Sequence, residues 1–438
     1  MGVEWRQVAE GENGLRLYRI DADSGNVSLG GGGAMRSPID LVFQRFETAT
    51  TRYLREHFTA PGSPVGASSF AVACHVVSLP ELLLVVDSTY RTTADEVFPG
   101  TLEAIVAGEG RLLADRPIRV LYTHAHFDHA GGHEAVEAMG GDVQVLAHRD
   151  TGRLFPFVSR REMFFRLKEV FFRDCGIEAP LEALTDEIRQ LYLRMIEESG
   201  ADMSRAPWGS IEDGPLRIDA LIEEETDRVL AGGRIQLLEF GGHIPGHLCV
   251  LVDGTHLITG DMWLPATTSL VTPRFAGSEA GIGAERFGVL RYVESDLELL
   301  GMPVDECMAY PSHEVVYRNP KRMAMRDLEL LVPRLERTYG VLEEHHTRPM
   351  RILDVAWGGS AHAPLWKVDG SMFRLVVAHD EAAAFVHDMA EVGDLREVEP
   401  HRWVWTGQTD LRDRLHSTLL DQRRDHGHLE FESRGRAA

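Results

Sequence analysis

Residues 121–132 read Leu-Tyr-Thr-His-Ala-His-Phe-Asp-His-Ala-Gly-Gly, and the rest of the chain is best understood outward from them. Three imidazoles and one carboxylate fall within six of these residues. They follow the apolar run Ile118 to Tyr122, which predicts a buried strand. The glycine pair and the run Glu134 to Met139 predict a loop that leads into a helix. This context places the polar cluster at a sheet edge, where α/β proteins keep their sites.

The spacing of these residues suits metal binding. His124 and His126 point to the same side of an extended backbone, as alternate residues do, so two neutral nitrogens can bind one divalent metal. Asp128 and His129 lie on the turning backbone just beyond and can aim at a second point. The other interpretation is a His-rich surface loop, or core histidines satisfied by hydrogen bonds. Because the motif follows a strand and precedes a loop and a helix, we favour the interpretation in which it supplies ligands to two metal sites.

These residues resemble the signature of the metallo-β-lactamase-fold hydrolases, and further family-like motifs follow in order. The matching segments are 82–87, which ends in Asp87, 241–247, which ends in His247, 257–261, which ends in Asp261, and 310–313, which ends in His313. Five ordered motifs are much harder to obtain by chance than one. The resemblance implies an α/β protein with the αββα sandwich of the metallo-β-lactamase fold.

The resemblance also implies a ligand set, carried over position by position. The implied ligands are His124, His126 and His247 for the first metal, Asp128, His129 and His313 for the second, and Asp261 as a bridge between them. Asp128 and Asp261 are also the predicted catalytic residues, and Asp87 is predicted to orient the ligand loop. The predicted cofactors are two divalent metal ions. Zinc is the default, and iron or manganese also suits imidazole and carboxylate ligands.

Departures from the family pattern narrow the function. Asp261 stands where the commonest antibiotic-cleaving lactamases have Cys, His126 where flavodiiron proteins have Glu, and Leu264 where the best-known homoserine-lactone lactonases have Tyr. With those groups disfavoured, the chain is similar to the glyoxalase II-like branch and to relatives with a C-terminal winged-helix appendage. That likeness implies cleavage of a small acyl thioester or ester, with a lactone left open, through attack by a hydroxide that bridges the two metals.

Two alternatives stay open, a metal-dependent endoribonuclease and a mononuclear-iron oxygenase of the same fold. A nuclease needs a Lys or Arg for each phosphate that it neutralises. The chain has 68 acidic and 45 basic residues, a net charge of −23. Between Val341 and Asp410 the acidic residues outnumber the basic ones twelve to six. Nucleic acid is therefore disfavoured as a partner, and a small acyl substrate is favoured.

The cysteine content and the first residues of the chain indicate where in the cell the protein is expected. Cys74, Cys175, Cys249 and Cys307 have no CxxC spacing, which fits reduced thiols in a cytoplasm better than disulfides. No apolar run approaches membrane-spanning length, and Met1 to Arg6 lack the features of a signal peptide. We expect a cytoplasmic protein with no membrane partner, and a homodimer stays open.

The length of 438 residues predicts a core fold with additions. The predicted parts are an N-terminal extension at 1–60, a catalytic domain at 61–318 with a helical insertion at 151–219, and an α-rich, winged-helix-like domain at 319–438. The apolar spacing over 321–344 predicts a long amphipathic helix. The insertion is either a lid over the metal cleft or an interface. In the lid interpretation, Phe164 or Phe171 contacts the substrate.

Overall fold

In the computed structural model, the described residues are 3–23, 71–89, 94–95, 97–140, 142–158, 169–177, 216–223, 228–265, 269, 271–272, 280–313, 315–346, 348–357, 372–426 and 429. Most of the predicted N-terminal extension lies outside them. So do Phe164 and the middle of the predicted insertion.

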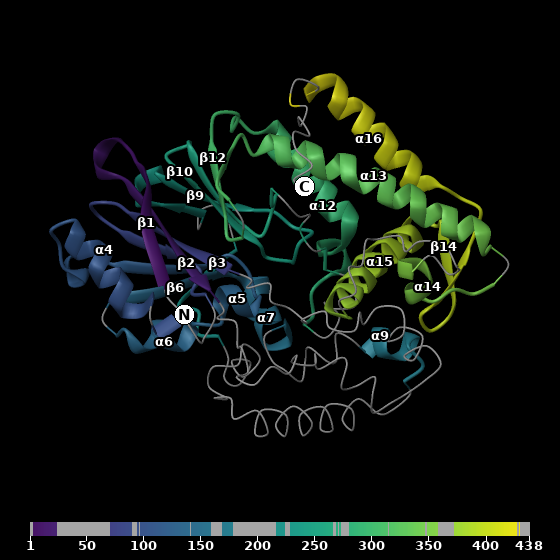
Figure 1. Cartoon of the computed structure of the whole chain (residues 1–438), viewed down its shortest axis with the longest axis horizontal. Helices are drawn as coiled ribbons and strands as arrows, with labels where there is room; N and C mark the ends of the chain where they lie inside the picture. Colours follow the sequence, from purple (N-terminus) through teal and green to yellow (C-terminus); the bar gives the residue numbers. More distant parts are fainter. Residues whose placement is uncertain are drawn as a thin grey trace, which may run out of the picture.

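Two β-sheets lie together in the left half of the molecule as drawn in Figure 1, with the C-terminal helices on the right. The first sheet has the strand order β1 (Val3–Glu10), β2 (Arg16–Asp23), β3 (Ala71–Ser78), β4 (Leu83–Val86), β5 (Ile118–Tyr122), β6 (Val143–His148), β7 (Ala220–Ile222). The second has the order β13 (Tyr317–Arg318), β12 (Met308–Pro311), β11 (His256–Gly260), β10 (Leu248–Val252), β9 (Ile235–Glu239), β8 (Val229–Leu230). Strands β4 to β7 are parallel neighbours, as are β11 and β12, so their carboxyl ends gather at common edges.

Helices cover the outer faces of both sheets. Helices α4 (Leu102–Gly108) and α6 (His133–Ala138) pack on the first sheet, and α12 (Gly288–Gly301) and α13 (Lys321–Glu344) pack on the second. Strand β4 illustrates the layering, because Leu83 and Val85 face the outer helices while Leu84 and Val86 face the second sheet. Each such fully buried side chain contributes about 1.5–3 kcal/mol. The predicted αββα sandwich is confirmed.

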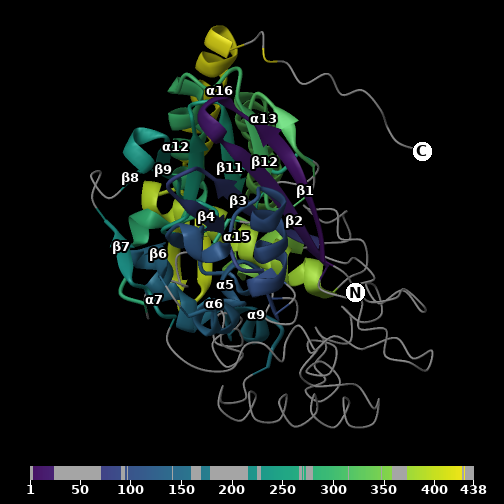
Figure 2. The same ribbon diagram turned by 90° about the vertical axis from the view of Figure 1, so that its left-hand side faces the viewer.

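The N-terminal strands belong to the first sheet. Strand β2 pairs antiparallel with β3, and β1 pairs with β2 at the edge of the sheet, as Figure 2 shows. Buried Arg19 of β2 donates to the Pro311 carbonyl at 3.0 Å. A strand within the predicted N-terminal extension is thus bonded to the segment that leads into His313.

The C-terminal part packs on the second sheet. The helix predicted over 321–344 is α13, with the same bounds. It is followed by α14 (Ile352–Trp357), α15 (Met372–Val392), the hairpin β14 (Leu395–Glu399) and β15 (Arg402–Trp405), and α16 (Asp410–His426). The winged-helix assignment of this part stays a prediction. One apolar cluster runs from Leu257 of the sheet through Val293 of α12 to Phe385 of α15.

The described parts of the insertion include α7 (Arg149–Val158) and α9 (Glu169–Asp174). Helix α9 lies beside α14 (Figure 1). The buried Asp174 carboxylate accepts hydrogen bonds from the Leu353 backbone N–H at 2.9 Å and from Arg402 at 3.0 Å. The Phe171 ring is buried, with its centroid 5.2 Å from that of His379 on α15. Phe171 therefore packs against the C-terminal helices, and the role of the other insertion residues stays a prediction.

Short elements complete the described chain. They are α5 (Phe127–Ala130), the π-helical turn η2 (Val97–Thr101), and the 3-10 turns η1 (Glu12–Gly14), η3 (Leu113–Asp115), η7 (Ala231–Gly233) and η8 (Ala284–Arg286). All four cysteines are free and buried. Within the described ranges, no helix has both the length and the apolar character that a bilayer crossing requires.

Candidate metal centre

The predicted site residues lie where strands end. His124 and His126 follow β5, Asp128 and His129 lie in α5, Asp261 follows β11, and His313 follows β12. The structure brings all six into two adjoining groups of potential ligands. His243, which follows β9, joins them.

The first group holds His124, His126, His243 and Asp261. His124 Nε2 lies 2.9 Å from His126 Nδ1, and His243 Nε2 lies 3.3 Å and 3.2 Å from those two nitrogens. Asp261 Oδ2 is 3.9 Å from His124 Nε2 and 3.6 Å from His243 Nε2. Four ligand atoms about 2.1 Å from a tetrahedral metal lie about 3.4 Å apart. The first group has these dimensions.

The second group holds Asp128, His129 and His313. His313 Nε2 lies 3.2 Å from Asp128 Oδ2, and His129 Nε2 lies 3.7 Å from the same oxygen. Asp261 Oδ1 is 3.2 Å from His129 Nε2 and 3.4 Å from His313 Nε2. Asp261 thus turns one carboxylate oxygen toward each group.

Two buried atoms beside the second group indicate a place for a cation. Neither His129 Nε2 nor Asp261 Oδ1 has a hydrogen-bond partner among the described residues, although they lie 3.2 Å apart. A buried polar atom without a partner costs about 1–3 kcal/mol. A divalent metal would satisfy both atoms, and imidazole with carboxylate is a donor set that Zn, Fe or Mn accepts. The residues present therefore fit two metal ions.

The geometry replaces His247 with His243 in the candidate ligand set. His247 Nε2 accepts a hydrogen bond from the Asp261 backbone N–H at 3.2 Å, and its Nδ1 faces Cys249 Sγ at 4.0 Å. Both ring nitrogens of His247 are thus directed at other atoms. Gly242, at φ 101°, reverses the chain against α12 so closely that a Cβ would lie 2.4 Å from Tyr292 Cα. This turn, which the spacing of the motif does not encode, aims His243 at the other donors.

Asp87, which follows β4, is hydrogen-bonded to the ligand loop. Its Oδ1 accepts the Thr123 backbone N–H at 2.7 Å, and its Oδ2 lies 2.9 Å from His129 Nδ1. The Thr123 hydroxyl lies 2.9 Å from both Asp87 Oδ1 and His124 Nδ1. One buried carboxylate therefore orients one ring of each group.

The two groups differ in protonation. Burial and neighbouring imidazoles lower the pKa of His124 well below its usual range and that of His126 to about 3. Burial also lowers the pKa of His313, but the Asp261 and Asp128 carboxylates outweigh it and raise that pKa to about 10. His124 and His126 are therefore already in the neutral form that binds metal, while metal binding to His313 releases a proton.

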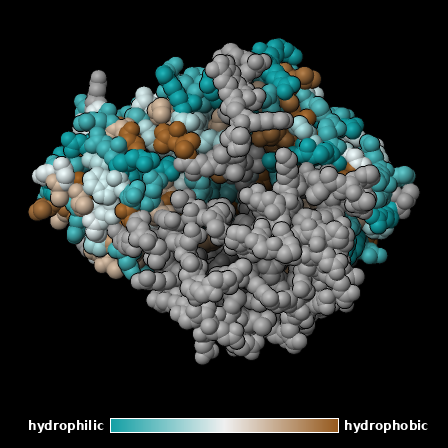
Figure 3. Space-filling view, in the orientation of Figure 1, coloured by the Kyte–Doolittle hydropathy of each residue, from teal (hydrophilic) through white to brown (hydrophobic). Residues whose placement is uncertain are grey.

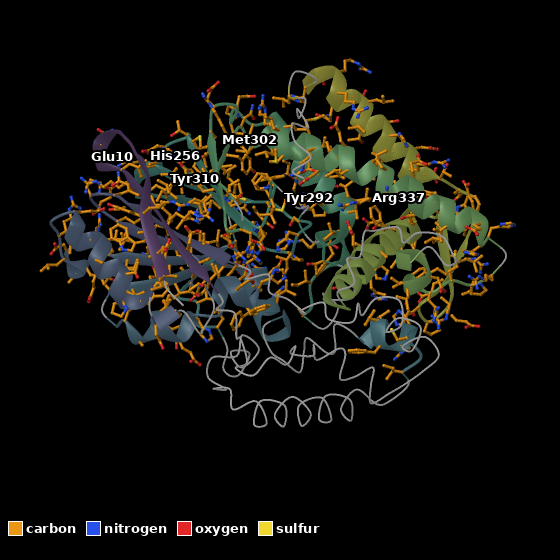
Figure 4. The ribbon with its side chains drawn as sticks, in the orientation of Figure 1. Glu10, His256, Tyr292, Met302, Tyr310 and Arg337 are labelled. Atoms are coloured by element: carbon orange, nitrogen blue, oxygen red, sulfur yellow. The ribbon has the colours of Figure 1, made fainter. Side chains whose placement is uncertain are left out.

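A buried polar network holds the segment that follows Asp261. Trp263 Nε1 donates to Asp296 Oδ1 of α12 at 2.7 Å, and Tyr317 donates to the Trp263 carbonyl at 2.7 Å. Arg326 of α13 donates to the Leu264 carbonyl at 2.6 Å. Tyr292 lies between the strands and the C-terminal helices (Figure 4) and donates to Asp327 at 2.8 Å. Helices α12 and α13 thus fix the backbone that carries Asp261.

Comparisons with known proteins agree with this architecture. A family model described as the metallo-beta-lactamase superfamily matches residues 69–333. No curated protein matches the chain. A beta-lactamase domain protein from Burkholderia ambifaria is 18% identical, with 80% of this chain and 95% of that chain covered at a TM-score of 0.50, a likeness in fold. A metallo-beta-lactamase family protein from Thermus thermophilus is also 18% identical, with coverage of 79% and 96% and a TM-score of 0.48.

Proposed function

Since the chain belongs to the metallo-β-lactamase superfamily, whose members are generally metal-dependent hydrolases, we propose that it is a dinuclear metallohydrolase that cleaves a small acyl thioester or ester. One observation carries the proposal. Asp261 directs Oδ2 to one group of histidines and Oδ1 to a second group that also contains Asp128. A carboxylate shared in this way is suited to holding two metals side by side.

The candidate ligands are His124, His126 and His243 for one metal, Asp128, His129 and His313 for the other, and Asp261 for both. Two bound divalent ions supply a water of lowered pKa and polarise the scissile carbonyl. Asp87 orients the His129 ring directly and the His124 ring through Thr123. Burial of His124 and His129 keeps bulk water from their nitrogens. The side chains thus provide a rigid site for hydrolysis.

Charge and burial argue against an RNA substrate. The second long helix of the C-terminal part, α15, would be the reading helix of a winged helix. From His379 onward it is largely buried, and Ala383, Phe385 and Met389 lie in the apolar core. The face over the C-terminal helices is mostly hydrophilic (Figure 3), but the segment between 341 and 410 is acidic. The net charge of −23 also opposes phosphate binding.

The deciding experiment compares substrates under one set of conditions. Metal-loaded protein is incubated with acyl-CoA and aryl thioesters, aryl esters, lactones, and single-stranded RNA, each with and without chelator. We expect chelator-sensitive hydrolysis of an acyl substrate, about two metals per chain, and loss of turnover in Asp261→Ala.

Other outcomes would redirect the proposal. Metal-dependent RNA cleavage without acyl hydrolysis would favour an endoribonuclease. One tightly held metal, with full activity in Asp128→Ala, would favour a mononuclear-iron oxygenase, since Asp128 belongs to the second group alone. A cytoplasmic location is part of the same proposal and is supported by four free, buried thiols.

A further inference from the structure

In three candidate ligand rings, the nitrogen that faces away from the other ligands, Nδ1, lies within hydrogen-bond distance of an oxygen. Thr123 Oγ1 and Asp87 Oδ2 lie 2.9 Å from the Nδ1 atoms of His124 and His129, and both come from the ends of sheet strands. Ser269 Oγ lies 2.9 Å from His243 Nδ1 and comes from the segment after Asp261. We infer that Ser269 is a positioning residue of the metal centre, which fixes the tautomer and the orientation of the His243 ring. The inference rests on the proposed function.

The tautomer matters because of what the other nitrogen faces. His243 Nε2 points at His124 Nε2, His126 Nδ1 and Asp261 Oδ2, at 3.2 to 3.6 Å. To bind a metal there, Nε2 must present a lone pair, so the ring proton must reside on Nδ1. Ser269 Oγ, which is buried, is in place to accept that proton's hydrogen bond. Such partners of a ligand's outer nitrogen set both tautomer and ring orientation.

A separate contact holds the backbone of His243. The Thr272 N–H donates to the His243 carbonyl at 3.1 Å and to the Gly242 carbonyl at 3.2 Å, and the Thr272 hydroxyl also bonds to the His243 carbonyl. With the backbone fixed by Thr272, the ring still has two torsions. The Ser269 hydroxyl is a hydrogen-bonding contact of Nδ1 that can select among ring positions, so its loss should affect metal binding more than folding.

The chain offers a matched control. Ser295 of α12 also lies buried against this loop, and its hydroxyl donates to the Gly241 carbonyl at 3.0 Å. Ser269→Ala and Ser295→Ala each remove one buried hydroxyl beside residues 241–243. Only the first removes a contact to an imidazole. A general loosening of the loop would affect both variants alike.

The test measures metal affinity by competition with a chromogenic chelator, using Zn(II) and Co(II), together with thermal unfolding of the metal-free proteins. We expect Ser269→Ala to weaken binding of one of the two metals about 10- to 100-fold. The visible spectrum of Co(II) bound to Ser269→Ala should differ from that of the unsubstituted protein. Ser269→Thr, which keeps a hydroxyl, should recover the metal affinity. Ser295→Ala should stay within about threefold of the unsubstituted protein, as expected of a contact that orients no ligand.

Failures of the two proposals can be told apart. If the unsubstituted protein binds no metal, the metal centre itself is wrong. If it binds two metals and Ser269→Ala binds both equally well, or if both variants lose affinity alike, only the role of Ser269 is overturned. Should Ser269→Ala fail to fold, Ser269→Cys, with a poorer acceptor of similar size, takes its place with the same expected order of affinities.

Discussion

His243 and His247 are four residues apart in one loop, and only His243 turns a ring nitrogen toward the other donors. We predict that His243→Asn loses one metal per chain, because it removes one of four ligands of the first group. His247→Asn should retain both metals and lose stability, because the Asp261 backbone N–H then lacks its acceptor. Metal content after gel filtration in mild chelator, with unfolding curves of the metal-free variants, measures both effects.

The comparison is internally controlled, since both substitutions are identical and both residues are buried. Loss of metal in the His247 variant alone would restore the ligand set that the sequence motif suggests.

Asp296 is a buried carboxyl group whose ionisation opposes folding. Burial raises its pKa well above its usual range, and the charge of Asp327 adds to the rise. One oxygen accepts the Trp263 N–H, while Oδ2 has no hydrogen-bond partner among the described residues. A carboxyl with a raised folded-state pKa contributes stability that is complete below its unfolded-state pKa, about 3.9. That contribution is lost as pH rises through the folded-state value.

We therefore predict that Asp296→Asn stabilises the protein above about pH 4, because the amide cannot ionise. The gain should increase with pH and reach about 1–3 kcal/mol, the usual penalty of an unpaired buried polar atom. Urea unfolding of metal-free protein across the pH range measures it. The exposed Asp305 provides the control Asp305→Asn, which should show no such trend. A gain that falls as pH rises would contradict the assignment.

Local spacing explains which site residues the sequence could identify. His124, His126, Asp128 and His129 lie within one motif, so their geometry follows from a strand that turns into a helix. The choice between His243 and His247 depends on the left-handed turn at Gly242 and on the approach of α12. Ser269 lies 26 residues from its ring partner, and no periodicity links the two. Contacts set by tertiary packing cannot be predicted from motif spacing alone.

At the scale of elements, strand β2 stabilises the last ligand segment. Arg19 bonds to the Pro311 carbonyl, two residues before His313, and pairs with Asp21 at 2.6 Å. We predict that Arg19→Met lowers the free energy of unfolding by about 1.5–3 kcal/mol, the usual value for a hydrogen bond to a charged group. It should also weaken the metal held by His313. Urea unfolding and metal titration measure these effects.

Arg16 provides a control on the same strand. Its pair with Glu10, at 3.7 Å, is largely exposed, so Arg16→Met should cost under about 1 kcal/mol. Equal losses in the two variants would mean that strand pairing, and not the bond to Pro311, explains the effect.

Elements with strong periodicity were predictable, and those joined over long distances were not. The apolar spacing of 321–344 predicted the helix α13 with its observed bounds. The hairpin of β10 and β11 also follows from two apolar runs joined by the turn at Asp253 and Gly254. Strands β1 and β2 fall in the predicted N-terminal extension, because they precede the first segment that resembles the family, and nearly 50 residues separate β2 from β3. Their pairing is set by the tertiary fold, in which β2 lies beside β3 on the side away from β4.

At the scale of the whole molecule, the catalytic sheets and the C-terminal helices share a core. The same apolar cluster contains Cys249 of β10, Leu299 of α12, Leu335 of α13 and Leu415 of α16. Asp388 of α15 also accepts the Leu290 N–H at 2.8 Å, near the start of α12. The predicted boundary at 318/319 follows the last ligand motif, but cooperativity depends on buried contacts that cross it.

We therefore predict one unfolding transition for the metal-free chain, with equal calorimetric and van't Hoff enthalpies. Removal of everything after residue 320 should prevent folding, because it uncovers the apolar faces of α12 and the second sheet. Differential scanning calorimetry of the full chain tests the first point, and circular dichroism of the shortened chain tests the second. Two separate transitions would mean that the C-terminal part folds independently.

The four buried cysteines can serve as natural reporters of local opening. Burial raises the pKa of each thiol, so none forms a reactive thiolate readily while its surroundings stay closed. The four lie in different segments: Cys74 in β3, Cys249 in β10, Cys175 in the turn after α9, and Cys307 in the segment before β12. When the protein is incubated with a thiol-reactive dye, the order in which the four cysteines are labelled would therefore report the order in which their surroundings open. No engineered reporter is needed.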